Sequence, residues 1–209
     1  MKVTVFGSTG RTGILVVEEA LKADYSVTAF ARQPEKLGID HAQLTLCQGE
    51  LLDSEAVAGA IHGAGAVIST LGPTSNRPEL TVSHGMDVIL TGMQRHGVRR
   101  LIVTAGAGIG DAEDAPTVFS RLMDVLVRTL ARNVYEDMLR MAELVRASDL
   151  DWTIVRTPML ADQPKTGQVK VAWVGKGMRP RLTRADLAAF LVSQVGDSSY
   201  LRRSPAVSN

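Results

Sequence analysis

The stretch VTVFGSTGRTG, residues 3–13, decides the fold of this chain. An apolar run leads into a loop with Gly7, Gly10 and Gly13, and then into a segment with apolar residues at helical spacing. Gly7 permits a tight turn, Gly10 lets the backbone approach a ligand, and Gly13 lets the helix pack against the strand. A strand, a glycine loop and a helix in this order predict a dinucleotide site whose phosphates rest on the helix N-terminus. The expected contacts in this loop are Gly7, Thr9, Gly10, Arg11, Thr12 and Gly13.

The rest of the chain alternates strand-like and helix-like stretches, which is typical of parallel βαβ units. Strands are expected at 2–6, 25–31, 43–48, 66–71, 101–104 and 152–156, and a short one outside the main sheet at 168–174. Helices are expected at 11–23, from 53, and at 80–96, 116–130, 133–147 and 183–195. These elements predict an α/β fold with a Rossmann-type, doubly wound parallel sheet. We expect one domain over residues 1–209, with small C-terminal elements on the substrate side.

Three residues mark the ends of two expected helices. Gly97 follows the helix that ends near residue 96, where glycine is the preferred residue for the left-handed conformation. Thr183 is a candidate N-cap of the last helix, and Asp186 three residues later completes a start similar to a capping box.

The composition excludes several classes of protein. Of 209 residues, 45% are hydrophobic and 22% charged, as in ordinary globular proteins, and the net charge of +1 argues against nucleic acid as the main partner. The sequence contains no run of about eighteen apolar residues, so no membrane span is predicted. It begins with a strand in place of a signal-peptide pattern, and we therefore expect a cytoplasmic protein. The lone Cys47 lies in an apolar run and is expected to be a buried strand residue. The four histidines lie in separate segments, so no metal site is expected.

The end of the second strand favours NADP(H) over NAD(H). NAD sites commonly place an acidic residue there to accept from the adenosine ribose, whereas this chain has Phe30-Ala31-Arg32. Arg32 is suited to a charge-assisted contact with a 2′-phosphate, and Arg11 is a candidate for the other side of the same phosphate. The alternative is that both arginines are solvated surface residues.

Several motifs together resemble a known superfamily. GSTGRTG at residues 7–13, GEL at 49–51, STLG at 69–72 and DWTIVRTP at 151–158 are similar to the atypical short-chain dehydrogenase/reductase superfamily, which includes NmrA-like proteins. The segment DQPKTG at 162–167 and the chain length resemble its biliverdin IXβ reductase/flavin reductase group. The resemblance covers almost the whole chain.

The resemblance implies further cofactor contacts at the carboxyl ends of the later strands. They are Glu50 and Leu51 by the adenine, Leu71 and Gly72 near the nicotinamide ribose, Thr104 and Ala105 beside the nicotinamide, and Pro158, Met159 and Leu160 on its other side.

The residues that usually transfer a proton in alcohol- and ketone-reducing members are missing. Tyr135 lies in the right region, but Leu139 stands four residues later, where a lysine would lower the tyrosine's pKa. The stretch after the fifth strand contains Thr104 in place of the usual serine. Thr104 and Tyr135 are therefore the candidate catalytic residues. The alternative for Thr104 is that it is a strand-end threonine, and the alternative for Tyr135 is packing or substrate contact.

These departures favour hydride delivery without a strict proton relay, as in reduction of a flavin, bilin or similar planar acceptor. Arg77, Arg156 and Lys165 are candidates to hold an anionic tail, and Trp173 to wall an aromatic pocket, although each has a structural or surface role as its alternative. A second interpretation is a non-catalytic NADP(H)-binding redox sensor of the NmrA type, and a third is a sugar isomerase or epimerase. Either a monomer or a homodimer is compatible with the sequence.

Overall fold

The computed structural model describes residues 1–73, 76, 81–117, 125 and 128–209. Most of the helix expected at 116–130, and Arg77, lie outside the described residues. The main sheet is built from β1 (Lys2–Phe6), β2 (Ser26–Ala31), β3 (Leu44–Gln48), β4 (Ala66–Ser69), β5 (Arg100–Gly106), β6 (Asp151–Thr157), β8 (Lys170–Ala172) and β10 (Ala206–Ser208). The described helices are α1 (Arg11–Lys22), α2 (Ser54–Ile61), α3 (Thr81–His96), α5 (Arg132–Ala147), α6 (Arg184–Ser193) and the 3-10 turns η1 (Pro34–Leu37) and η2 (Ala107–Ile109).

The sheet has the strand order β3-β2-β1-β4-β5-β6-β10-β8. Strands β1 to β6 pair in parallel, and the order reverses at β1, which lies between β2 and β4. This is the doubly wound Rossmann topology that the alternating elements predict, and that prediction is confirmed.

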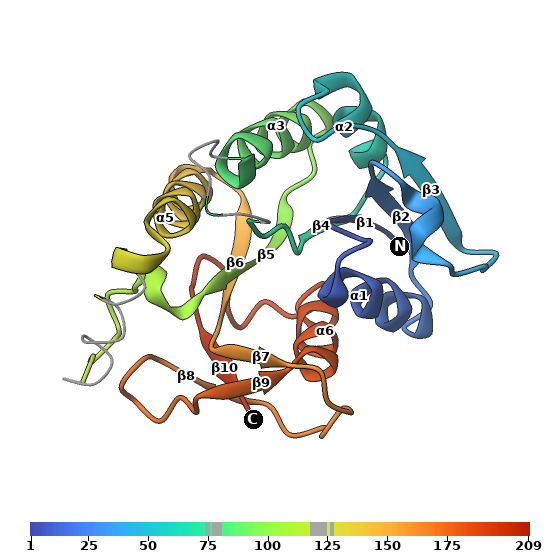
Figure 1. Ribbon diagram of the computed structural model, residues 1–209. Coiled ribbons are helices and arrows are strands. Elements are labelled where there is room, and N and C mark those ends of the chain that lie inside the picture. Colours follow the sequence, from blue (N-terminus) through green and yellow to red (C-terminus); the bar gives the residue numbers. More distant parts are fainter. Residues whose placement is uncertain (74–75, 77–80, 118–124, 126–127) are drawn as a thin grey trace.

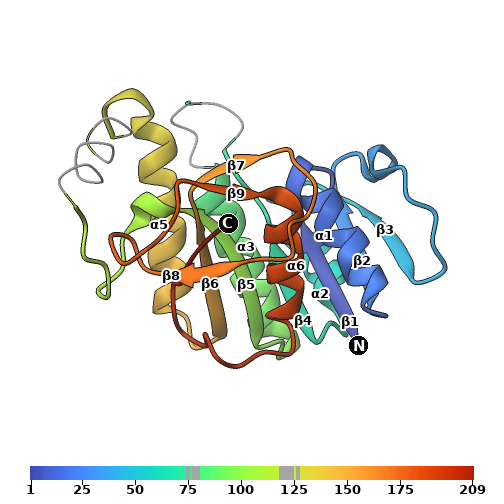
Figure 2. The ribbon, with the colours of Figure 1, turned by 90° about the horizontal axis from the view of Figure 1, so that it is seen from below.

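Helices cover both faces of the sheet (Figure 1). The side chains of α2, α3 and α5 pack in one core with Phe6, Phe30 and Trp152. Those of α1 and α6 pack in a second core with Val3, Val5 and others on the opposite face. Figure 2 looks onto the second face, with α1 and α6 side by side in front of the sheet. None of the described helices is long and apolar enough to cross a membrane.

The prediction for the C-terminal strands was partly wrong. The strand expected outside the main sheet, β8, joins its edge by pairing antiparallel with β10, which follows β6 in the strand order. A two-stranded parallel sheet of β7 (Met159–Ala161) and β9 (Arg181–Thr183) was not predicted. Each of these strands has only three residues, too few for a recognisable alternation of apolar and polar positions.

The predicted helix ends are confirmed. Gly97 adopts φ +66°, and its N–H bonds to the carbonyl of Gln94 after α3. Thr183 is the N-cap of α6, where its hydroxyl oxygen accepts from the backbone N–H of Asp186 at 3.1 Å. The cap at the start of α3 comes from another helix. The buried carboxylate of Asp137 on α5 accepts from the N–H groups of Val82 and Ser83.

Asp186 anchors the DQPKTG segment to α6. Its buried carboxylate accepts from the N–H and hydroxyl of Thr166, the N–H of Gly167 and the side chain of Asn209. Burial raises the pKa of this carboxyl, but hydrogen bonds from Thr183, Thr166 and Gly167 lower it, and the net pKa lies below the usual value. The segment that carries the subgroup resemblance is therefore held in place by an ionised aspartate.

Arg156 forms a buried ion pair, which corrects its interpretation as a substrate contact. Its side chain is fully buried, and Nη1 and Nη2 donate to the two carboxylate oxygens of Asp114 at 2.6 and 2.8 Å. Nε donates to the carbonyl of Ser204 at 2.6 Å. The two nitrogens best placed for a ligand are thus occupied by Asp114. Asp114 thus fastens the loop after η2 to β6.

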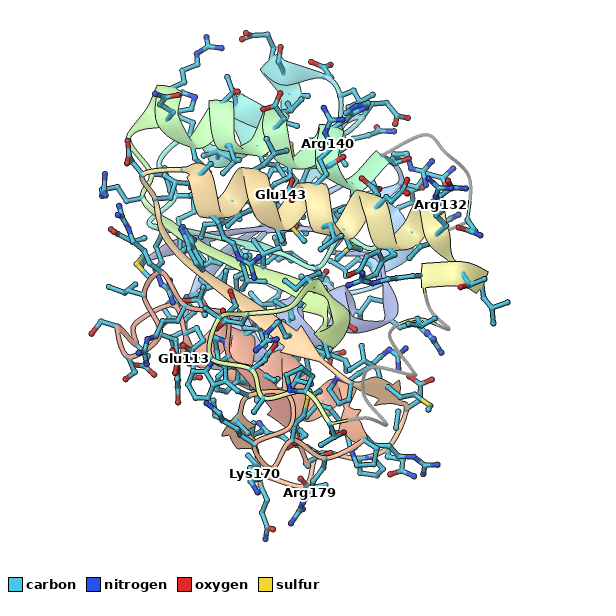
Figure 3. The ribbon with its side chains drawn as sticks, turned by 90° about the vertical axis from the view of Figure 1, so that its left-hand side faces the viewer. Glu113, Arg132, Arg140, Glu143, Lys170 and Arg179 are labelled. Carbon is cyan, nitrogen blue, oxygen red and sulfur yellow. The ribbon has the colours of Figure 1, made fainter. Side chains whose placement is uncertain are left out.

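We expect D114A to lower the free energy of unfolding by about 3–5 kcal/mol, because it leaves the Arg156 guanidinium buried without a counter-charge. Urea denaturation followed by circular dichroism measures the change. The control is E136A, which breaks the exposed Arg132–Glu136 pair on α5 and should have a much smaller effect on stability. Arg132 lies on the outer face of that helix (Figure 3). Equal losses in the two variants would contradict the structural role of Asp114.

We expect the stability contribution of Asp186 to be lost in acid. Since its folded-state pKa is lowered, the contribution is complete above the unfolded value of about 4 and disappears as the pH falls through the folded value. D186N should therefore be less stable than the wild type at pH 7, by about 1–3 kcal/mol, and should lose less on acidification. Urea midpoints between pH 7 and pH 3 check this, and parallel curves for the two proteins would refute it.

Candidate functional site

The candidate site lies where the strand order reverses, at the carboxyl ends of β1 and β4. In open α/β sheets ligands bind in the crevice outside this point, because the loops from the two strands run apart there. The loop after β1 carries Gly7, and the loop after β4 carries Leu71 and Gly72. The Thr70 hydroxyl joins the two loops by donating to the carbonyls of Phe6 and Gly7, each at 3.2 Å.

Gly7 and Gly13 have the turn and packing roles that the sequence predicts. Gly7 adopts φ +75°, and Gly10 closes the turn by donating its N–H to the Gly7 carbonyl at 3.0 Å. A Cβ on Gly13 would lie 2.0 Å from the Gly7 oxygen, so α1 reaches the loop only because this side chain is absent. A Cβ on Gly10 would meet only the Gly7 oxygen, at 3.2 Å, which leaves the outer side of the loop open.

The N-terminus of α1 is suited to phosphate. Its N-cap is Gly10, without a side-chain cap and with no acidic residue in the first turn. By contrast, Asp53 caps α2 and Thr183 caps α6. The first-turn N–H groups of α1 therefore have no side-chain acceptor among the described residues, and an anionic diphosphate would satisfy them.

The residues expected on the adenine side are Arg32, Glu50 and Leu51. Arg32 is exposed at the end of β2 and has no ion pair among the described residues, while its carbonyl accepts from Gln48. Glu50 is exposed, whereas Leu51 packs so close to Gly85 that a Cβ there would lie 2.1 Å away. Arg32 is thus available to an anion, and Leu51 also has a packing role.

Arg11 points to a different partner from the one expected. Its Nη1 donates to Asp162 Oδ2 at 2.7 Å, and Asp162 Oδ1 lies 3.1 Å from Arg184 Nη1. Asp162 belongs to the segment that directly follows β7. The sequence did not indicate Asp162 or Arg184, because their proximity to Arg11 arises from the packing of α6 beside α1.

The expected nicotinamide side has few polar groups. Thr104 is partly buried, and its hydroxyl lies 3.5 Å from the carbonyl of Ser69. Ala105 is buried, and its carbonyl accepts from Thr157 at 3.2 Å. Met159 is 68% exposed at the start of β7, between Pro158 and Leu160, which are partly buried. This wall is therefore largely apolar.

Tyr135 is committed to other contacts. Its hydroxyl donates to the carbonyl of Gly108 at 3.2 Å, and the guanidinium of Arg128 lies 4.8 Å from the ring centroid. Leu139, at the position where a lysine would be needed, packs against the core. No lysine contacts Tyr135 in the hydrogen bonds and ion pairs of the described residues.

The remaining substrate candidates do not gather at one point. Lys165 donates to Glu19 on α1 at 2.8 Å, and this bond contributes most to lowering the pKa of the Glu19 carboxyl. Trp173 follows β8 and stacks with Arg203, whose guanidinium lies 5.9 Å from the ring centroid. Cys47 is half-buried on β3, and burial raises the pKa of its thiol.

An open cavity of about 510 Å³ lies elsewhere, between the end of α5 and the start of β6. Arg146 and Trp152 line it, and Arg146 Nη2 donates to the carbonyl of Gly110 at 2.6 Å. None of the expected cofactor contacts lines this cavity.

A family model described as NAD(P)H-binding matches residues 7–198, which begin at the first glycine of the loop. The chain belongs to this NAD(P)H-binding family. The resemblance to the atypical short-chain dehydrogenase/reductase superfamily is thereby confirmed, and so is the prediction of a nicotinamide dinucleotide cofactor.

Curated relatives of this NAD(P)H-binding protein are distant. Oxidoreductase ptaF of Pestalotiopsis fici is 29% identical over 162 residues, which are 71% of this chain and 61% of that protein. Oxidoreductase dmxR7 of Cryptosporiopsis sp. is 28% identical over 166 residues, 71% of this chain and 68% of that protein. The chain thus spans about three fifths to two thirds of the length of these relatives.

Solved structures with the same fold cover the whole chain. A short-chain dehydrogenase/reductase of Veillonella parvula in complex with NADP has a TM-score of 0.81 and 20% identity, over 100% of this chain and 94% of that one. ChuY of Escherichia coli O157:H7, an anaerobillin reductase, has a TM-score of 0.76 and 20% identity, over 100% of this chain and 97% of that one.

We expect G13A to abolish measurable NADPH binding, because the new Cβ forces α1 away from the Gly7 carbonyl. Overpacking at this contact should also lower the free energy of unfolding by about 1–3 kcal/mol. The control is G59A in α2, where a Cβ meets nothing within 4 Å and should stabilise the helix by up to about 1 kcal/mol. Fluorescence titration with NADPH measures binding, and a G13A protein that binds like G59A would contradict this role of Gly13.

Proposed function

We propose that this protein is an NADPH-dependent oxidoreductase that transfers hydride to a planar conjugated acceptor of the flavin or bilin class. The proposal rests on a combination of phosphate-binding and apolar features expected at the carboxyl edge of the sheet. The N-terminus of α1 has no side-chain cap, Arg32 has no ion pair among the described residues, and the expected nicotinamide side is largely apolar. Leu139 stands where a lysine would follow Tyr135, whose hydroxyl donates to the Gly108 carbonyl.

The proposed roles of the chain's own residues are binding and orientation. The loop from Gly7 to Gly13 would hold the diphosphate, and Arg32 the 2′-phosphate. When bound, the dihydronicotinamide supplies a hydride. Thr104, Ala105 and Met159 would border the place where the acceptor lies flat. A conjugated acceptor suits this site, because solvent can supply the proton that Tyr135 is poorly placed to give.

Two comparisons support this choice of reaction. Curated relatives include proteins named as oxidoreductases, and one protein of the same fold is an anaerobillin reductase, which acts on a bilin-type acceptor. The alternative is a non-catalytic NADP(H) sensor. The engaged hydroxyl of Tyr135 and the absence of the usual serine favour that alternative.

NADPH oxidation by the purified protein, followed by nicotinamide absorbance, tests the proposal. The acceptors are FMN, FAD, riboflavin, biliverdin and small quinones, with NADH in parallel. We expect turnover with a flavin or bilin. Saturable NADPH binding with no turnover on any acceptor would overturn the reductase and favour the sensor.

We expect R32A to weaken NADPH binding by about ten- to a hundredfold and to leave NADH binding nearly unchanged, because only NADPH carries the 2′-phosphate. Titration of both cofactors measures the ratio. The control is R140A, which removes an exposed arginine from the outer face of α5 (Figure 3) and should change neither affinity. Equal weakening of NADPH and NADH by R32A would disprove its selective role.

A further inference from the structure

Asp162 bridges two arginines that begin neighbouring helices. Its Oδ2 accepts from Arg11 Nη1 at 2.7 Å, and its Oδ1 lies 3.1 Å from Arg184 Nη1. Arg11 is the first residue of α1 and Arg184 the first residue of α6. The two helices pack against each other on the same face of the sheet (Figure 2). One carboxylate therefore lies at the positive ends of two helices.

The two sides of this bridge differ in burial. The Arg184 side chain is only 11% exposed. Its Nη1 is buried and forms an ion pair with Asp162, but it makes no hydrogen bond with any described residue. Asp162 and Arg11 are 58% and 72% exposed. A buried guanidinium requires a nearby anion, whereas an exposed carboxylate can rotate toward solvent at little cost in free energy. Arg184 is therefore fixed in place, and Asp162 is free to leave.

No other carboxylate nearby in sequence can replace Asp162. Residues 163–185 contain six basic residues and no acidic one. The next carboxylate, Asp186, is already surrounded by donors from Thr166, Gly167, Thr183 and Asn209. If Asp162 moves away, residues 163–185 supply no counter-charge for Arg184, and an anion from outside the protein would fill that place.

We propose that Asp162 occupies the diphosphate position while no cofactor is bound, and that Arg184 contacts the cofactor diphosphate once Asp162 is displaced. This inference rests on the proposed NAD(P)H site at the glycine loop. The diphosphate of a bound dinucleotide lies at the N-terminus of α1, which begins with Arg11, the partner of Asp162. One anion thus replaces another, and Arg184 has a counter-charge in both states.

The exchange has a consequence for affinity. Binding of NADPH or NADH has to break the contacts of Asp162 with Arg11 and Arg184, so Asp162 weakens the binding of both cofactors. Because the diphosphate is common to the two cofactors, Arg184 should not distinguish between them. This separates Arg184 from Arg32, which should act on NADPH alone.

Calorimetric titration of NADPH and NADH into the wild type, D162N, R184Q, R184K and D162N/R184Q tests the exchange. We expect D162N to bind both cofactors about five- to thirtyfold more tightly, because the two ion pairs of the exposed Asp162 carboxylate no longer have to be broken. R184Q should bind both about ten- to a hundredfold more weakly, and R184K should recover part of the loss. In the double variant the gain from D162N should shrink, because one of the arginines that Asp162 occupies is gone.

The control variant is E143Q, which removes an exposed carboxylate from α5 and should leave both affinities unchanged (Figure 3). Urea midpoints confirm that each variant is folded. An equal gain from D162N with and without Arg184 would mean that Asp162 only repels the cofactor at a distance, and would overturn the exchange. So would unchanged binding in R184Q or weaker binding in D162N. A wild-type protein that binds neither NADPH nor NADH would refute the proposed function, and the exchange together with it.

Discussion

The close contact between the first turn of α1 and the end of β1 sets the geometry of the cofactor edge. At Gly13 the helix backbone approaches the Gly7 carbonyl so closely that a Cβ would lie 2.0 Å from the oxygen. Because no side chain separates them, α1 begins directly above the point where the strand order reverses. The same contact places the N-terminus of α1, which has no side-chain cap, at this edge of the sheet. The loops after β4, β5 and β6 carry the other expected cofactor contacts.

Charged groups divide into two kinds according to burial. The Arg156–Asp114 pair and the Asp186 cluster are buried, and they fasten the C-terminal segments to β6 and α6. Around the glycine loop the charges are exposed, as in Arg32 and the Arg11–Asp162 pair. Buried pairs are costly to break and suit a permanent structural role, whereas exposed charges exchange partners easily and suit a ligand site. Arg184 stands between the two kinds, as a buried cation with an exposed partner.

The chemistry proposed for the site follows from what its residues can and cannot do. The Tyr135 hydroxyl is bonded to the Gly108 carbonyl, and Leu139 takes the place of the lysine that would lower its pKa. A site of this kind contributes orientation more than proton transfer. That property fits an acceptor whose reduction needs a well-placed hydride and a proton from solvent.

Local sequence by itself determined the glycine loop, the alternation of strands and helices, the Gly97 and Thr183 helix ends and the family. These features depend on residues close together in the chain, where side-chain periodicity and backbone freedom act directly. Only the tertiary structure decided the partners of charged residues and the short C-terminal strands. The sequence made Arg156 a candidate substrate contact, with a structural role as the alternative. In the folded chain it forms a buried ion pair with Asp114, which lies 42 residues away in the sequence. Arg184 meets Asp162 because α6 packs beside α1. Such pairings depend on which segments the folded chain brings together, and no local pattern encodes that.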